Sequence, residues 1–273
     1  MDHHVRTIVF LATLACAVSG RSAGPSPPLP LVDHPQVAGA KSVKPDAQAR
    51  KVNAEERAVA ALTELNVPLG RDPSGRVQWI EAANGELTDE AMRHLPGLPM
   101  LEWLEVGGGK VTAVGMAFLK GCTALRRLYI HDVSLTNDAL DWLAGLRLQA
   151  LSLQRTGIAG KVLQHLKAAS SLTVLNLSEN DIVDEDLSQV ARFTGLEVLA
   201  LQNTKVTGAG LARLKNMARL NVINLMNCRI VDADLSHFHS MPNLRIVQAA
   251  GCNLSDQAVK ELTDKLTMLA VFR

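Results

Sequence analysis

The chain has 273 residues, of which 47% are hydrophobic and only 3% aromatic, so it can bury a large core of aliphatic side chains. Its 28 basic and 27 acidic residues nearly cancel, and a net charge of +1 gives no electrostatic reason to expect a nucleic acid or an anionic membrane surface as partner. After the first 20 residues, no apolar run is long enough to span a membrane.

Residues 1–20 have the pattern of an export signal. Arg6 supplies a positive charge, and residues 8–18 form an apolar segment that is too short to span a membrane. We therefore expect cleavage just before Gly20 and an exported protein in the periplasm, on the cell surface or secreted. The small residues that suit this cleavage are Ala17 and Ser19.

Two alternatives remain open at this end of the chain. A lipid anchor at Cys16 is the first, although Thr13 stands where a lipoprotein signal prefers an aliphatic residue. An uncleaved or unrelated N-terminal segment is the second.

Residues 21–46 are rich in Pro, Ser, Gly and Ala, and the prolines exclude a regular element of any length. We predict a disordered, semi-stiff linker here, which serves either as a spacer or as an inert extension. Residues 47–66 then place apolar side chains every three to four positions, which predicts a helix that Pro68 ends. With the turn signal at residues 72–75, residues 47–76 are expected to form an N-terminal helical cap.

From Val77 the chain repeats itself every 24 residues, with one repeat of 23. Each repeat reads L-x-x-L-x-L, followed by an aliphatic residue at position 11 and apolar residues at positions 16 and 19. Residues 77–273 hold eight repeats and a partial ninth, which begin at Val77, Leu101, Leu125, Leu148, Leu172, Leu196, Leu220, Leu244 and Met268.

The pattern of one repeat predicts a short strand followed by a helix. Positions 4 and 6 alternate with polar neighbours and form the inner face of the strand, and positions 16 and 19 form the inner face of the helix. Positions 12 and 13 hold residues that cap the helix, as in Thr88 with Asp89, Ser255 with Asp256 and Val231 with Asp232.

A single repeat cannot bury its own apolar face, but a stack of repeats can. Parallel strands lie about 4.8 Å apart, whereas packed helices need roughly 8–10 Å each. The stack must therefore curve, with the strands on the inside.

This pattern resembles the leucine-rich-repeat family in its short bacterial form, and it is similar to ribonuclease-inhibitor-like solenoids and to the cysteine-containing repeats of F-box adaptors. The resemblance covers about residues 47–273. It implies an α/β solenoid, a right-handed horseshoe arc with parallel strands on the concave face and helices on the convex face. It also implies a non-catalytic scaffold that binds a protein partner.

Strand positions 3, 5 and 7 point into the concave face, and the large polar and aromatic side chains gather in the first three repeats. Since Trp, Tyr and Arg most often anchor interfaces, we expect a protein partner to bind there. Alternatively, the large side chains cover the capped end of the stack, or the face takes a small ligand. The predicted patch consists of Trp79, Glu81, Trp103, Glu105, Arg127, Tyr129 and His131, whereas Trp142 falls on a helix.

The resemblance also implies a structural ladder at position 9, in the turn after the strand, where side chains bond to the backbone. A disulfide between Cys228 and Cys252 is an alternative, because neighbouring strands are close enough for one. Position 8 of three successive repeats holds Asp132, Arg155 and Glu179, which predicts a ladder of alternating charge. The position-9 ladder consists of Asn180, Thr204, Cys228 and Cys252.

The sequence predicts no metal site, cofactor or enzymatic activity. The acidic residues between 179 and 186 lack the turn glycine of a calcium loop and suit the first turn of a helix. The His residues and the cysteines do not fall at metal-ligand spacing. The chain has no H-E-x-x-H, no G-x-S-x-G and no phosphate-binding glycine loop, since the glycines at 107–109 are not followed by Lys-Ser or Lys-Thr.

Two other functions remain as alternatives. The sequence ends inside the predicted ninth strand, which would leave an open sheet edge near Met268, Leu269 and Val271. A structural or envelope-tethering element would self-associate through this edge. An F-box-like adaptor would need several helices before the repeats, where the sequence predicts one.

Overall fold

The computed structural model describes residues 53–135, 140–166 and 171–273. The chain separates into two compact units, Met1–Val52 and Asn53–Arg273, and the first of them lies outside the described residues. The export signal at residues 1–20, the lipid anchor at Cys16 and the linker at residues 21–46 therefore lie outside the described residues too. They stay predictions.

The described part begins with helix α2 (Ala54–Glu64), whose N-terminus is closed by Asn53. The Asn53 side chain accepts a hydrogen bond from the Glu56 N–H at 2.8 Å, and the Glu56 carboxylate accepts the Asn53 N–H at 3.3 Å. Strand β1 (Gly70–Arg71) follows and pairs antiparallel with β2 (Val77–Ala82). This hairpin covers the first edge of the sheet, so the repeats begin against a paired strand.

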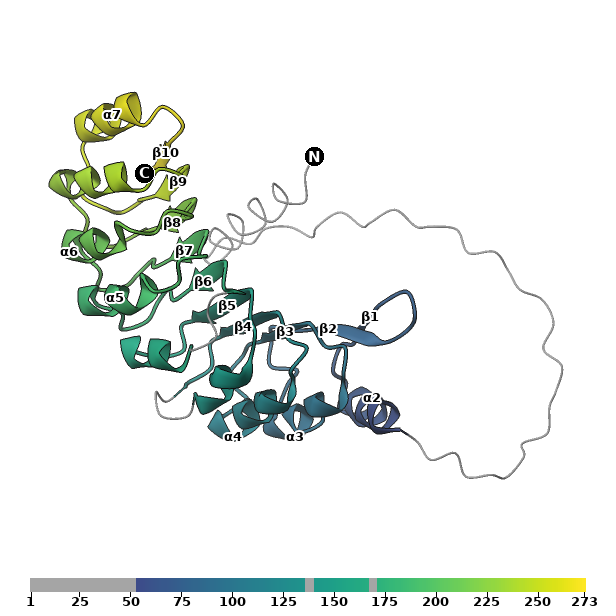
Figure 1. Ribbon diagram of the computed structural model, residues 1–273. Coiled ribbons are helices and arrows are strands. Elements are labelled where there is room, and N and C mark those ends of the chain that lie inside the picture. The colour runs from purple at the N-terminus through teal and green to yellow at the C-terminus, as the bar shows by residue number, and fades with distance from the viewer. Residues whose placement is uncertain (1–52, 136–139, 167–170) are drawn as a thin grey trace, which may run out of the picture. The chain divides into compact units, whose positions relative to one another are not determined.

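The strands of the described residues belong to one sheet whose order follows the chain, from β1 to β10 (Figure 1). Each strand from β3 to β10 pairs in parallel with its predecessor, and equal repeat positions face each other, as in the row Leu104, Leu128 and Leu151. The strands of the repeats after β2 are β3 (Trp103–Val106), β4 (Arg127–His131), β5 (Ala150–Gln154), β6 (Val174–Asn176), β7 (Val198–Ala200), β8 (Val222–Asn224), β9 (Ile246–Gln248) and β10 (Ala270–Phe272).

Among the described residues, the outer side of most repeats holds one turn of α-helix, a 3₁₀ segment, or both. The last repeat differs, because its outer side is a ten-residue α-helix. These segments are α3 (Asp89–Met92), η1 (Leu95–Gly97), α4 (Ala113–Met116), η2 (Ala117–Gly121), η4 (Asp141–Gly145), η5 (Gly160–His165), η7 (Asp184–Asp186), α5 (Leu187–Val190), α6 (Gly208–Leu211), η8 (Ala212–Leu214), η9 (Asp232–Ser240) and α7 (Asp256–Lys265).

The stack curves with its strands along the inner side and its helices along the outer side (Figure 1). This arrangement confirms the predicted α/β solenoid with parallel strands. The curvature follows from the wider spacing that helices and their side chains need.

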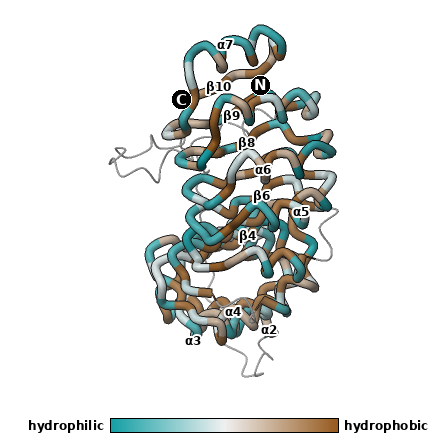
Figure 2. Tube along the Cα trace, turned by 90° about the vertical axis from the view of Figure 1, so that its left-hand side faces the viewer, coloured by the Kyte–Doolittle hydropathy of each residue, from teal (hydrophilic) through white to brown (hydrophobic). Residues whose placement is uncertain are grey.

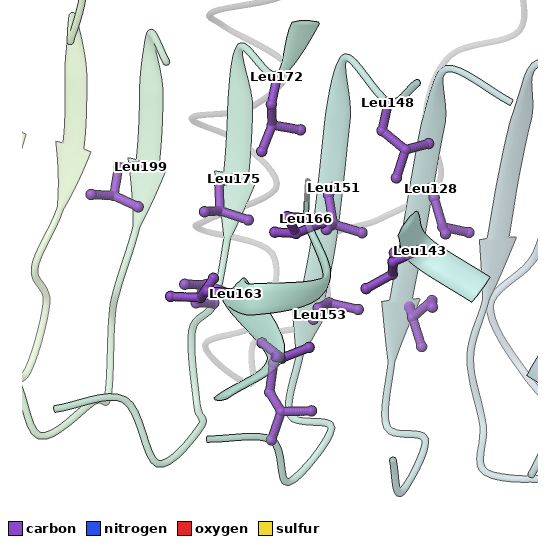
Figure 3. Packing of buried hydrophobic residues seen from close by; sticks show 14 of the residues in the cluster. Leu128, Leu143, Leu148, Leu151, Leu153, Leu163, Leu166, Leu172, Leu175 and Leu199 are labelled. Atoms are coloured by element: carbon purple, nitrogen blue, oxygen red, sulfur yellow. The ribbon is translucent and has the colours of Figure 1, made fainter. Parts of the chain in front are cut away.

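One continuous hydrophobic core fills the space between the two sides. Hydrophobic and hydrophilic stretches alternate along each turn of the stack (Figure 2). In Figure 3, Leu128, Leu151 and Leu175 come from successive strands, and Leu143 and Leu163 from helical segments point toward them. These five leucines are at most 2% exposed, and burying each one stabilises the fold by about 1.5–3 kcal/mol.

The residue at position 8, just after the strand, has a left-handed backbone in seven repeats. Asn and Gly accept this conformation readily, but for Arg155 (φ 50°) and Glu179 (φ 59°) it costs on the order of 1 kcal/mol or more. The turn redirects the chain so that the next side chain, at position 9, points back beneath the strand. The left-handed residues at position 8 are Gly108, Asp132, Arg155, Glu179, Asn203, Asn227 and Gly251.

The position-9 side chains bond to backbone groups that the strands leave unpaired. Asn180 Nδ2 donates to the carbonyl of Leu153 in the preceding repeat at 2.6 Å, and Asn180 Oδ1 accepts the N–H of Thr156 at 3.0 Å. The thiols of Cys228 and Cys252 each donate to a carbonyl of the preceding repeat at 3.1 Å, and Thr204 bonds within its own repeat. Both cysteines are free thiols here.

On the outer side, a carboxylate at position 13 joins neighbouring repeats. Asp184 Oδ1 accepts the backbone N–H of Thr207 at 2.7 Å, and Asp184 Oδ2 accepts the Thr207 hydroxyl at 2.6 Å. We call this contact the aspartate clamp. It recurs between Asp89 and Thr112 and between Asp232 and Ser255.

The clamp corrects the expectation that positions 12 and 13 both cap their own helix. The hydroxyl does so, since Thr88 Oγ1 accepts the N–H of Ala91 at 3.3 Å. The carboxylate at position 13 instead reaches the next repeat. Where position 12 is Val231, the cap comes from Asp234, whose carboxylate accepts the Val231 N–H at 2.9 Å.

A second contact between repeats explains why positions 160 and 208 hold glycine. The carboxylate of Asp186, which caps the N–H of Val183, lies directly on Gly160 of the preceding repeat, where a Cβ would collide with it. Asp234 lies on Gly208 in the same way. Asp184 and Asp186 thus have structural partners.

We predict that Asp184→Ala lowers the free energy of unfolding by about 1.5–3 kcal/mol, because two hydrogen bonds to a charged group are lost. Denaturant unfolding followed by circular dichroism measures this change. Glu185→Ala, in the same turn but exposed, is the matched control and should change the value by less than about 0.5 kcal/mol. Equal values for the two variants would contradict the clamp.

The last strand, β10, pairs with β9 in the described part of the chain. Leu269 is buried, whereas Met268 is 71% exposed and Phe272 is 56% exposed. These exposed side chains lie where the sequence predicts an open edge. Self-association through this edge stays a prediction.

Candidate functional site

The seven side chains predicted for the concave face lie on three neighbouring strands, β2, β3 and β4. The sheet register aligns Trp79 with Trp103 and Arg127, and it aligns Glu81 with Glu105 and Tyr129. Because alternate residues of a strand point to opposite faces, both rows share the face opposite the leucine core. We call Trp79, Glu81, Trp103, Glu105, Arg127, Tyr129 and His131 the N-terminal patch.

Trp103 and Tyr129 form the aromatic centre of the patch. Their ring centroids lie 6.3 Å apart with an interplanar angle of 81°, which is the favourable edge-to-face geometry. Burial raises the pKa of the Tyr129 hydroxyl. The indole N–H of Trp103 is buried and has no hydrogen-bond partner among the described residues.

Trp79 has a structural role as well. Its indole lies against the backbone of Gly70 in β1, so closely that a Cβ at position 70 would collide with the ring. The side chain therefore fixes the β1–β2 hairpin at the end of the sheet. This contact favours the alternative that a large residue here covers the capped end, and it makes Trp79 a poor choice for a binding test.

His131 links two carboxylates at the border of the patch. Its Nε2 lies 3.4 Å from Glu105 Oε1, and its Nδ1 lies 3.1 Å from Asp132 Oδ2. The ring passes over Gly107, where a Cβ would collide with it, so glycine is needed at that position. Glu105 first and Asp132 second raise the pKa of His131 above its usual value.

Charged contacts continue from His131 along the turns. The guanidinium of Arg155 lies 2.9 Å from Asp132 Oδ1 and 2.5 Å from Glu179 Oε2, and Gln154 donates to the same Glu179 carboxylate at 2.7 Å. The alternating charges at position 8 thus form the predicted ladder. Each exposed pair contributes about 0–1 kcal/mol, so the ladder orients side chains more than it stabilises the fold.

On the later strands of the concave face, polar side chains form hydrogen bonds within the sheet. The side chains of Asn176 and Asn224 accept backbone N–H groups two residues further on, at 2.9 and 3.0 Å. Asn224 also donates to Gln202 at 2.9 Å. These groups are satisfied within the sheet, whereas Glu81 is exposed and has no ion pair or hydrogen bond among the described residues.

Other candidates from the sequence fall outside the patch. Trp142 is buried in η4 and fills the core, and His165 lies 3.1 Å from Asp141 on the outer side. Burial raises the pKa of the Cys122 thiol to about 12, which leaves it unreactive. Where the chain is described, no three His, Cys, Asp or Glu residues gather in a way that could hold a metal ion.

The sequence could not show which patch residues have partners. The signal for the His131–Glu105 contact lies in Gly107, since a glycine at position 7 of one repeat leaves room for a large side chain at position 7 of the next. The signal for Trp79 lies in Gly70, which precedes the first repeat and belongs to a strand that the sequence did not predict.

No protein-family model and no curated protein sequence matches the chain. Among solved structures, it is similar to internalin C2 from Listeria monocytogenes, with a TM-score of 0.58, 24% identity, and coverage of 85% of this chain and 99% of that one. It is also similar to a second internalin from Listeria monocytogenes, internalin F, with a TM-score of 0.51, 19% identity, and coverage of 74% of this chain and 64% of that one.

These similarities and the sheet described above show that the chain has the leucine-rich-repeat fold. They show the fold alone. In the part of the chain that is described, none of the helices combines the length and the apolar character that crossing a membrane demands.

We predict that Glu105→Gln lowers the pKa of His131, because the Glu105 carboxylate is the main cause of its rise. Titration of the His131 ring by NMR measures the change, and Asp132→Asn should lower the pKa by less. The raised pKa means that this pair stabilises the fold below about pH 6.5 and loses that effect as the pH rises through the pKa of folded His131. An unchanged titration in Glu105→Gln would contradict the contact.

Proposed function

We propose that the chain is a non-catalytic, exported scaffold that binds a protein partner through the N-terminal patch. The observation that carries this proposal is the edge-to-face pair Trp103 and Tyr129, which stands among charged side chains on the inner face of the sheet. Aromatic residues of this kind supply most of the binding free energy in many interfaces. The leucine-rich-repeat fold, which commonly serves as a binding scaffold, supports the proposal.

The stack also supports binding through its rigidity. Each patch strand is paired on both sides, and the aliphatic side chains beneath it are buried, so the backbone that carries the patch is fixed before a partner arrives. Preorganised side chains lose less conformational entropy on binding. The one histidine of the patch contacts carboxylates at both ring nitrogens, which supports an interaction surface more than a catalytic one.

The double variant Trp103→Ala and Tyr129→Ala tests the site. We expect it to weaken capture of the partner at least tenfold relative to the parent chain, since truncating an anchor typically costs 2 kcal/mol or more. Its matched control is Met226→Ala with Gln248→Ala, at the other end of the concave face. Equal loss in both variants, or none in either, would contradict binding at the patch.

A photo-cross-linking residue identifies what touches each surface in the same experiment. Placed at Glu81, it should link the chain to the partner. Placed at exposed Phe272, it should give no product if the patch proposal holds. Cross-links between two copies of the chain from Phe272 would favour the alternative, a structural element that self-associates through β10.

Export is proposed from the predicted signal at residues 1–20. The full chain, expressed in a bacterial host, should be recovered outside the cytoplasm with Gly20 as its first residue, as mass spectrometry can show. A lipid-modified Cys16 as first residue would support the anchored alternative, and a protein that keeps Met1 inside the cell would contradict export.

A further inference from the structure

The charges of the N-terminal patch are unbalanced around Glu81. This carboxylate is exposed and has no ion pair among the described residues, and its partner across the sheet is a second carboxylate, Glu105. Neighbouring parallel strands lie about 4.8 Å apart, and like charges directly opposite each other destabilise a sheet. Glu81 and Glu105 thus form a pair of like charges on the inner face of the sheet.

The patch compensates only one of the two carboxylates. His131 lies 3.4 Å from Glu105, and it carries a charge only when it is protonated. The guanidinium of Arg127 stands in the row of Trp79 and Trp103, and it makes no ion pair with either glutamate in the described part of the chain. Glu81 therefore keeps its charge uncompensated.

Aromatic rings border the same carboxylates. Trp103 lies two residues from Glu105 on β3, and Tyr129 is the neighbour of Glu105 on β4. A cation within about 6 Å of an aromatic ring is attracted to its face, and more strongly where water is partly excluded. Carboxylates beside partly buried rings are a combination that suits an ammonium or guanidinium group.

We propose that the protein partner inserts a cationic side chain, a lysine or an arginine, between Glu81 and Glu105 and against the rings of Trp103 and Tyr129. The inference rests on the proposed function and names the chemistry of the partner. Arg127 lies in the row of Trp79 and Trp103, so its charge repels a cation from that row and favours the row of Glu81, Glu105 and Tyr129. The carboxylates of Asp132 and Glu179 already bind Arg155 and do not compete.

A synthetic peptide tests this chemistry directly. The probe is a twelve-residue peptide of four Gly-Ser-Lys triplets, titrated into the full chain while NMR follows the indole signals of Trp103 and Trp142. We expect saturable shifts at Trp103 and none at buried Trp142. The same peptide with acetylated lysines keeps the shape but loses the charge, and it should not bind. Equal binding of both peptides would overturn the proposal.

The glutamates are tested by removing their charge without changing their shape. Glu81→Gln with Glu105→Gln should weaken binding of the lysine peptide about tenfold or more. Its matched control, Glu185→Gln with Glu197→Gln, changes the net charge equally but lies off the patch, and it should bind as the parent does. Equal weakening in both variants would reveal only non-specific attraction and would overturn the proposal.

Capture of the partner by the two double variants distinguishes this inference from the proposed function. If capture needs Trp103 and Tyr129 but is unaffected by Glu81→Gln with Glu105→Gln, the patch is the binding site and the proposal of a cationic side chain is wrong. If capture needs neither pair, the proposed function itself is wrong. If capture needs both pairs, both stand.

Discussion

One repeat of this chain cannot bury its leucines alone, and it depends on the repeats on either side of it. This one constraint fixes the equal spacing of the repeats, because a shift of one residue would turn an entire strand's leucines away from the core. It also aligns equal positions of successive strands in rows, as Leu104, Leu128 and Leu151 show. The same register aligns the side chains of the concave face. Packing of the core therefore determines how these side chains are arranged, although they lie outside the core.

The strand, the turn after it and the outer side of a repeat have different structural roles. The turn after the strand holds the side chains that satisfy backbone groups, such as Asn180, and the outer side holds the clamps, such as Asp184 with Thr207. Strand positions 3 and 5 face away from the leucine core, and some of their side chains, such as Glu81, make no ion pair or hydrogen bond in the described part of the chain. In the N-terminal patch, exposed Glu81 lies opposite Glu105 on the neighbouring strand, and like charges in this position destabilise a sheet. A bound cation would compensate this pair.

The repeat pattern in the sequence predicted the strands, the buried leucines and the rows of the concave face, since all of them follow from spacing along the chain. It predicted the charge ladder at position 8 but missed other contacts between neighbouring repeats. The reach of Asp184 to Thr207 and the position of His131 over Gly107 depend on turn geometry and on small residues in a neighbouring repeat. The left-handed backbone of Arg155 was equally hidden, because arginine gives no signal for that conformation.

We propose that a preformed patch on β2, β3 and β4 binds a partner without rearrangement of the stack. Hydrogen–deuterium exchange of the full chain, with and without its captured partner, tests this claim most directly. We expect slower exchange confined to these strands and the turns that follow them, with the outer helices and β10 unchanged. Slower exchange at β10 or along α5, α6 and α7, with β2 to β4 unchanged, would contradict it.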